Sequence, residues 1–335
     1  MKSFPGRGVC QRACQAAGWV AARAAAPFRY CDISIFHEFA PPPAGGGHQF
    51  LRALKQEWER RGFRVEVNAV SGTTRACLLN SFNFDADCFR FLRREGCRTI
   101  HRVDGPLAVY RGMDDGTDRK IAEWNREFAQ GTVMQSRFSL QAHTEMGLAF
   151  RDPVVIPNAA DPEIFYAPER RANLGGRKLR VISTSWSDNR NKGADVYEWL
   201  DRNLDFGCVE YTFVGRLPLK MENIRVIPPI ASLGLAKLLR EHDVYLTASR
   251  NDPCSNSLIE ALICGLPAVY LKSGGHPEIV GEAGLGFGTA DEIPALLEQM
   301  TTELGWFREK IRVPRIADVA DLYLAVLGLS WEAPR

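Results

Sequence analysis

Two carboxylates stand eight positions apart in the stretch YLTASRNDPCSNSLIEALICGLPAVYL. Asp252 lies in a turn rich in Asn, Asp and Pro, and Glu260 lies in an apolar run with helical spacing. Eight residues make about two helical turns, so both carboxylates can face one pocket. The N-terminus of the helix between them offers unpaired N–H groups to a phosphate. The stretch therefore predicts a site for a sugar nucleotide, with carboxylates for hydroxyls and amides for the pyrophosphate.

The elements around these carboxylates read as strand, loop, helix, strand and loop. Polar turns at 249–256 and 272–277 follow successive predicted strands, so they meet at the carboxyl edge of a parallel sheet, where open α/β sheets bind ligands. Burying the carboxylate of Glu260 without a partner is costly, so a ribose diol is its expected ligand, and a structural ion pair is the alternative. The residues expected to line the phosphate site at the start of the helix are Cys254, Ser255, Asn256, Ser257 and Leu258.

Length and composition fit a globular protein of two domains. The chain has 335 residues, of which 45% are hydrophobic and 24% charged, and its net charge of +2 does not indicate nucleic-acid binding. Nine cysteines without a CxxC pair favour reduced thiols and a cytoplasmic location. We find no apolar run near the roughly 18 residues of a membrane span.

The first 30 residues contain five Lys and Arg residues, many alanines and no acid. We interpret residues 1–30 as an N-terminal extension that can be disordered. A transit peptide and a helix that lies on a membrane surface are the alternatives, and the second would give the protein a peripheral membrane contact.

Two series of alternating strands and helices predict an α/β fold with two Rossmann-like, doubly wound domains that face one another across a cleft. The first domain is expected at 31–160 and a Pro- and Glu-rich linker at 161–177. The second domain is expected at 178–312, and the helical segment 313–335 is placed to pack back on the first domain.

Further candidate site residues lie in loops that follow other predicted strands. Gly46 and Gly47 belong to a glycine turn between a strand and a helix, an arrangement that can cradle phosphate. Lys192 heads a predicted helix, where the positive end of the dipole makes an anion its natural partner. The DAD sequence at 85–87 invites comparison with a metal-binding DxD motif, but Asp ahead of a helix is a common cap, so we expect no metal site.

The stretch with Asp252 and Glu260 resembles the donor-binding signature of family 4 retaining glycosyltransferases, in which seven residues separate two glutamates. The resemblance extends from about residue 32 to 288. It rests on four more segments: GGGHQFLRAL, IHRVDGP at 100–106, IPNAADPEIF at 156–165 and STSWSDNRNKG at 183–193. It implies the B-type (GT-B) fold, with the acceptor bound largely by the first domain and a nucleotide sugar largely by the second.

The resemblance also implies residue roles. Lys192 would contact the donor diphosphate, His101 the donor sugar near the reacting carbon, and Asp252 the sugar hydroxyls, which makes these three the catalytic candidates. The family's usual arginine is Ser187 here, and Arg190 could supply its charge. Both residues are therefore assigned to donor binding, together with Gly46 and Gly47. Arg102 and Asp104 are the acceptor-binding candidates.

The function predicted is transfer of a sugar, with retention, from a nucleoside diphosphate sugar to a hydroxyl of a glycan, lipid or small molecule. No metal or other cofactor is expected, no nucleic acid takes part, and the oligomeric state stays open. Two alternatives remain. One is a nucleotide-sugar 2-epimerase of the same fold, and the other is a degenerate, non-catalytic nucleotide-sugar-binding protein, which the departures at Ser187 and Asp252 would explain.

Overall fold

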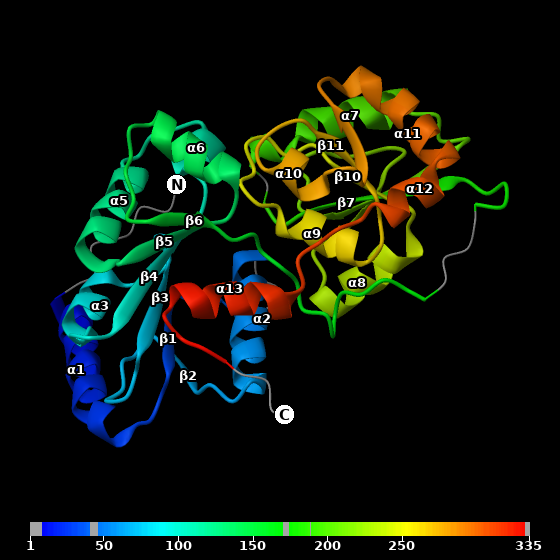
Figure 1. Ribbon diagram of the computed structural model, residues 1–335. Coiled ribbons are helices and arrows are strands. Elements are labelled where there is room, and N and C mark those ends of the chain that lie inside the picture. Colours follow the sequence, from blue (N-terminus) through cyan, green and yellow to red (C-terminus); the bar gives the residue numbers. More distant parts are fainter. Residues whose placement is uncertain (1–8, 41–45, 170–173, 188, 332–335) are drawn as a thin grey trace.

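The computed structural model describes residues 9–40, 46–169, 174–187 and 189–331. These residues form two domains, each built on a six-stranded sheet whose strand pairs are all parallel. Helices cover both faces of each sheet, and the two sheets stand side by side (Figure 1). The predicted α/β fold with two Rossmann-like domains is confirmed.

The first sheet has the strand order β2-β1-β3-β4-β5-β6. Its strands are β1 (Ile33–Phe36), β2 (Val65–Val67), β3 (Ala76–Asn80), β4 (Arg98–Val103), β5 (Gly131–Met134) and β6 (Pro153–Val155). The helices of this domain are α1 (Val9–Ala25), η1 (Ala26–Phe28), α2 (Gly46–Arg60), α3 (Ala86–Leu92), α4 (Leu107–Arg111), α5 (Thr117–Phe128) and α6 (Arg137–Glu145).

The second sheet has the order β12-β11-β10-β7-β8-β9, in which the winding reverses between β7 and β10. Its strands are β7 (Leu179–Ser185), β8 (Val209–Gly215), β9 (Arg225–Ile227), β10 (Val244–Thr247), β11 (Ala268–Leu271) and β12 (Gly284–Phe287). The helices of this domain are η2 (Arg190–Lys192), α7 (Ala194–Asn203), α8 (Ser232–Glu241), α9 (Asn256–Ile263), α10 (His276–Val280), η3 (Ala290–Glu292), α11 (Ile293–Thr302) and α12 (Leu304–Glu309).

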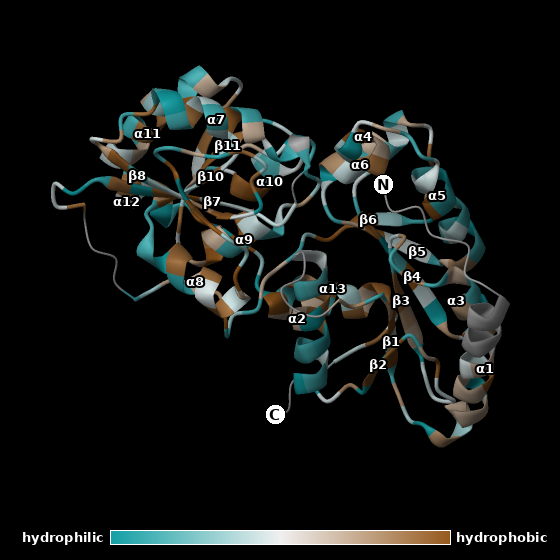
Figure 2. Cartoon of the chain, turned by 180° about the vertical axis from the view of Figure 1, so that it is seen from behind, coloured by the Kyte–Doolittle hydropathy of each residue, from teal (hydrophilic) through white to brown (hydrophobic). Residues whose placement is uncertain are grey.

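The central strands are apolar because helices bury them on both faces. All four residues of β1, β10 and β11 are buried, and separate apolar clusters fill the two sides of each sheet. Figure 2 shows hydrophobic strands inside layers of helices whose outer faces are more hydrophilic. Each sheet is therefore the rigid support for the loops at its carboxyl edge.

The last helix, α13 (Ile316–Val326), returns from the second domain and packs on α2 of the first. Tyr323 is fully buried there between Phe50 and Trp58, with ring centroids 5.9 and 6.4 Å away. Trp58 also donates a hydrogen bond from Nε1 to the carbonyl oxygen of Ala320 at 3.4 Å. The chain therefore crosses between the domains twice, which restricts how they can move apart.

The N-terminal extension differs from the disordered segment that its composition allowed. Residues 9–25 form α1, which packs on α3 (Figure 1). Trp19 lies 6.3 Å from Phe91 between ring centroids, and Arg23 donates to the carbonyl oxygen of Phe91 at 2.9 Å. Residues 1–8 lie outside the described part of the chain. Within that part, none of the helices is both long and apolar enough to cross a membrane.

The two domains contact one another at the carboxyl edges of their sheets. The carboxylate of Glu278 accepts hydrogen bonds from the backbone N–H groups of Arg137 and Phe138, both at 3.0 Å. A Cβ on Gly46 would lie 2.4 Å from the Cβ of Asn256, so only glycine permits this approach. The ligand-binding edges of both sheets therefore face the same space.

Candidate active site

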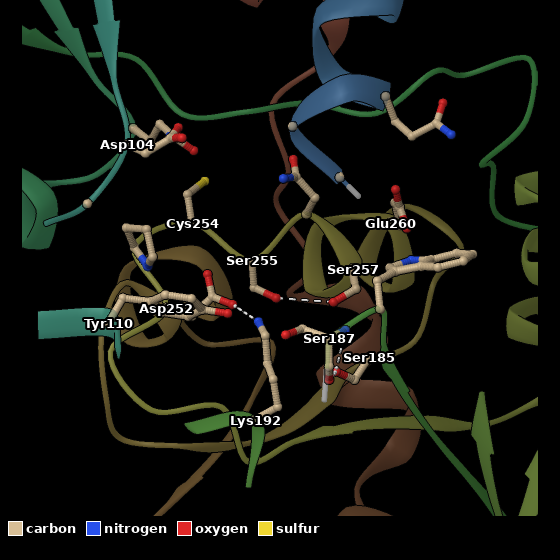
Figure 3. A pocket seen from close by; sticks show the side chains of 18 of the residues that line it. Asp104, Tyr110, Ser185, Ser187, Lys192, Asp252, Cys254, Ser255, Ser257 and Glu260 are labelled. Atoms are coloured by element: carbon tan, nitrogen blue, oxygen red, sulfur yellow. Dashed lines mark hydrogen bonds and ion pairs between the residues drawn. The ribbon is translucent and has the colours of Figure 1, made fainter. Parts of the chain in front are cut away.

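A cavity of about 330 Å³ lies between the two domains (Figure 3). It opens at the point where the winding of each sheet reverses, beside the ends of β1 and β3 in the first domain and of β7 and β10 in the second. The predicted site residues that line it are Gly46, Gly47, Arg102, Asp104, Ser187, Lys192, Asp252, Cys254, Ser255, Asn256, Ser257 and Glu260. The structure therefore brings most of the predicted site together.

Lys192 ends the short helix η2 that follows β7. Gly193 comes next with φ 82°, and a Cβ there would lie 2.4 Å from the Cβ of Ala248, so the turn requires glycine. The ammonium of Lys192 lies 2.8 Å from Oδ2 of Asp252. Burial acts to lower the pKa of Lys192, but the carboxylate of Asp252 outweighs it and raises this pKa. Lys192 is therefore a fixed positive charge in the cavity.

Asp252 lies in the loop between β10 and α9 and is 7% exposed. Burial acts to raise its pKa, yet the nearby ammonium of Lys192 brings the pKa below its usual range. Its backbone is held as well, because the N–H of Gly275 donates to the carbonyl oxygen of Asp252 at 2.8 Å. The loop thus presents an ionised carboxylate to the cavity.

Helix α9 points its N-terminus at the cavity. The first N–H groups of a helix have no partner inside it, and the side chain of the N-cap residue Ser255 does not cap them. Ser255 pairs instead with Ser257, hydroxyl to hydroxyl, at 3.2 Å. Leu258 and Leu262 bury the opposite side of the helix in the core. As far as the described residues show, these N–H groups therefore remain free to bind an anion.

Glu260 lies one turn further along α9 and is 6% exposed. Burial raises the pKa of this carboxyl group to about 8. Among the described residues no hydrogen bond or ion pair reaches the Glu260 side chain, although the residue lines the cavity. A buried carboxyl group without a partner is unfavourable, so a ligand that donates hydrogen bonds fits here.

His101 is a correction to the predicted site. It lies inside β4 and not at the end of the strand, is fully buried, and does not line the cavity. Its Nε2 lies 2.9 Å from the carbonyl oxygen of Ser81, and its Nδ1 lies 3.5 Å from Nδ2 of Asn125. Burial lowers the pKa of His101 to about 4, so the ring is neutral. His101 therefore supports the core of the first domain and does not reach a sugar in the cavity.

Arg102 also differs from its predicted role as an acceptor ligand. The side chain is 1% exposed, and its guanidinium donates to Asn80 at 2.6 Å and to Asp104 and Asn158 at 2.9 Å each. Gln135 donates to the same oxygen of Asp104. Arg102 is thus bound to side chains of the first domain and holds Asp104 in place. Within the described ranges, these hydrogen bonds to the Asp104 carboxylate all go to one oxygen, so of the two acceptor candidates Asp104 is the one that offers the cavity a second oxygen.

Three further predictions concern Cys254, Arg190 and Asp85. Cys254 is buried at the cavity wall, where burial raises the pKa of its thiol to about 12. The side chain of Arg190 lies outside the described part of the structure, so its predicted role stays a prediction. Asp85 caps α3 by accepting from the N–H groups of Asp87 and Cys88. In the described part of the chain no three His, Cys, Asp or Glu side chains come together as metal ligands.

The cavity also contains residues that the sequence did not single out. Tyr110 enters from α4 of the first domain, and its ring centroid lies 5.3 Å from Nζ of Lys192. Trp186 and Gln135 line the cavity as well. Trp186 and Gln135 directly follow β7 and β5, and Trp186 stands within the segment STSWSDNRNKG that carries the resemblance. Tyr110 has no such motif, because its place depends on how the two domains meet. The nearest sequence signal for it is the DGP turn ahead of α4, which ends a strand at the ligand-binding edge.

Comparison with known proteins agrees with this geometry. Residues 208–304 match the family model described as glycosyl transferases group 1. A viral protein, Uncharacterized protein 356 of Sulfolobus islandicus rod-shaped virus 1, is 25% identical over 191 residues. That match covers 52% of this chain and 53% of the viral protein, so the chain spans about half the length of this curated relative.

Solved structures match over nearly the whole chain. Sucrose-phosphate synthase from Thermosynechococcus elongatus has a TM-score of 0.67 and 13% identity, covering 90% of this chain and 95% of that one. Anabaena Alr3699/HepE, solved in complex with UDP-glucose, has a TM-score of 0.62 and 16% identity, covering 89% and 96%. AviGT4, a glycosyltransferase involved in avilamycin A biosynthesis, has a TM-score of 0.56 and 13% identity, covering 90% and 100%. The chain thus has the two-domain GT-B fold of these structures, and residues 208–304 match the glycosyl transferases group 1 model.

Proposed function

We propose that the protein is a retaining glycosyltransferase that moves a sugar from a nucleoside diphosphate sugar to a hydroxyl acceptor. The observation that carries the proposal is the convergence of three groups on one cavity: the ammonium of Lys192, the open N-terminus of α9 and the unpartnered carboxyl group of Glu260. The first two suit a diphosphate and the third suits a ribose diol.

In this proposal the diphosphate leaves toward positive charge. Lys192 and the N–H groups at the start of α9 lie on the same wall of the cavity and would neutralise the charge that develops on the leaving oxygen. The backbones that carry these groups are fixed by η2 and α9 before the donor arrives, so after Lys192 has exchanged Asp252 for the phosphate, little reorganisation is needed during the reaction itself. Because the chain itself supplies this charge, we propose a reaction that is independent of metal.

Asp252 and Asp104 stand on opposite sides of the proposed reacting centre. Asp252 belongs to the second domain and would bind hydroxyls of the donor sugar once a phosphate draws Lys192 away. Asp104 belongs to the first domain, where Arg102 and Gln135 hold one of its oxygens and leave the other for an acceptor hydroxyl. The acceptor would then attack from the face that the diphosphate leaves, which gives retention without a protein nucleophile.

The comparisons support a nucleotide sugar as donor, and they make UDP-glucose, the ligand of Anabaena Alr3699/HepE, the first compound to test. We also propose a cytoplasmic reaction, since the seven cysteines whose state is described are free. A peripheral membrane contact through the Arg-rich start of the chain remains part of the proposal.

The test is a thermal-shift panel of UDP-, GDP- and ADP-sugars, followed by product analysis with the donor that binds. A bound donor raises the melting temperature by mass action. Transfer to a hydroxyl acceptor with the anomeric configuration of the donor, read by NMR, is the expected result. Sugar conversion without any acceptor would point to the epimerase instead. Binding without consumption across a set of acceptors would point to the non-catalytic protein.

A further inference from the structure

Tyr110 occupies an unusual place for a residue of the first domain. Helix α4 carries it across to the second domain, where its ring lies 5.3 Å from the ammonium of Lys192. Figure 3 shows Tyr110 beside Asp252 and Lys192 at the same end of the cavity. An ammonium within about 6 Å of a ring centroid is attracted by the negative face of the ring. Lys192 therefore has two neighbours, a carboxylate from its own domain and an aromatic ring from the other.

The position of α4 is fixed from both domains. In the first domain, the carboxylate of Asp118 accepts from the N–H groups of Leu107 and Ala108 at 2.8 and 2.9 Å. In the second domain, the side-chain amide of Asn191 donates to the carbonyl oxygen of Tyr110, and that of Asn251 donates to the carbonyl oxygen of Val109 at 3.3 Å.

The two amides are sequence neighbours of the ion pair, because Asn191 precedes Lys192 and Asn251 precedes Asp252. The carbonyl groups at the end of a short helix need donors, and these two asparagines supply them. The same two loops that present the charged pair therefore also hold α4. The contacts that join α4 to the second domain therefore also place the ring of Tyr110 beside Lys192.

We propose that Tyr110, supplied by the first domain, is a positioning residue that prepares the ammonium of Lys192 for the donor diphosphate; this inference rests on the proposed function. A diphosphate must compete with the carboxylate of Asp252 for Lys192, because both are anions. The ring of Tyr110 is uncharged and attracts the ammonium without replacing the phosphate. It keeps the side chain directed into the cavity while the carboxylate partner is exchanged.

The test measures binding of inorganic pyrophosphate, UDP, GDP and ADP by titration calorimetry. Tyr110→Leu removes the aromatic ring and keeps a side chain of similar apolar character. We expect it to weaken binding of the diphosphates about tenfold, which is the size that a partly desolvated cation–π contact allows. Tyr110→Phe keeps the ring and is expected to restore most of this affinity. The matched control is Tyr166→Leu, which removes a ring lying 4.2 Å from Cζ of Arg240, outside the cavity.

A double-mutant cycle with Lys192→Ala separates positioning from general damage. If Tyr110 acts through Lys192, Tyr110→Leu has no further effect once the lysine is absent. The inference is overturned if Tyr110→Leu binds pyrophosphate as wild type does, or if its effect stays the same size in the Lys192→Ala background. A wild-type chain that binds pyrophosphate and none of the nucleoside diphosphates would contradict the proposed function and leave the Tyr110 contact measurable with pyrophosphate.

Discussion

The ammonium of Lys192 lies 2.8 Å from Oδ2 of Asp252, although 60 positions separate the two residues. They follow β7 and β10, neighbouring strands at which the winding of the second sheet reverses. Both side chains are partly or fully shielded from water, with 21% and 10% of their surfaces exposed. A diphosphate that enters this cavity must therefore separate an ion pair before it can use Lys192.

The ion pair predicts opposite effects of Asp252→Asn on binding and on transfer. Without the carboxylate, Lys192 lacks a counter-ion, so pyrophosphate binds more tightly, on the order of tenfold. Transfer falls because an amide is a poorer acceptor for the sugar hydroxyls. Titration calorimetry and a product assay measure the two effects. Asp195→Asn is the control, since that aspartate pairs with Arg250 outside the cavity. Weaker pyrophosphate binding in Asp252→Asn would contradict the competition.

Glu260 predicts that donor affinity rises with pH. Its pKa is about 8 without ligand because of burial, and hydrogen bonds donated by a ribose diol would stabilise the carboxylate and lower that pKa. Donor binding then releases a proton, so the affinity for a nucleotide sugar rises between about pH 6.5 and pH 8, by at most about tenfold per pH unit. Binding titrations across this range should show the rise in wild type and none in Glu260→Gln. A flat or falling wild-type profile would exclude this role.

The same residue predicts a gain in stability on substitution. The pKa of Glu260 is about 8 in the folded chain and about 4.5 when the side chain is exposed to water, so the folded state binds the extra proton between these two values. The free energy of unfolding therefore falls as pH rises from about 4.5 to about 8 because of this group. Glu260→Gln removes the cost of ionising a buried carboxyl group. The substitution should therefore stabilise the protein by on the order of a few kcal/mol at pH 8.5, and much less at pH 5. Urea unfolding of wild type and Glu260→Gln at pH 8.5 and at pH 5 measures this difference. An equal gain in the free energy of unfolding at both pH values would refute the raised pKa of Glu260.

His101 gives a prediction that distinguishes a structural role in the core from a catalytic role in the cavity. Because the ring is buried away from the cavity, His101→Gln should lower the melting temperature and keep the transfer rate per folded molecule. Losing a buried hydrogen bond costs about 1 to 3 kcal/mol. Activity is normalised to the folded fraction from circular dichroism. A stable variant without activity would return His101 to the list of catalytic candidates.

The sequence located Lys192, Asp252 and Glu260 because each depends on local structure. A lysine before a helix, an acid in a strand-to-helix loop and an acid in an apolar helix can be read over a few residues. The sheet topology then brings them together, since neighbouring parallel strands end at the same edge. The two-domain α/β fold followed from the same alternation of strands and helices.

His101 and Tyr110 show where local patterns fail. The strand β4 runs to Val103, so His101 lies two residues before its end, inside the sheet, and Asp104 takes the edge position. Helices cover both faces of this parallel sheet, so a side chain within the strand is buried in the core. Tyr110 reaches the site only because α4 docks on the opposite domain. Contacts between domains leave no periodic signal in one sequence.

The central claim is that Lys192 and Glu260 bind a nucleoside diphosphate sugar in the cavity between the domains. The most direct measurement is calorimetric titration of UDP-, GDP- and ADP-sugars into wild type, Lys192→Ala and Glu260→Ala, with folding checked by circular dichroism. The account predicts saturable binding of at least one donor to wild type and a loss of about tenfold or more in each variant. Wild-type failure to bind every donor, or unchanged affinity in both folded variants, would contradict it.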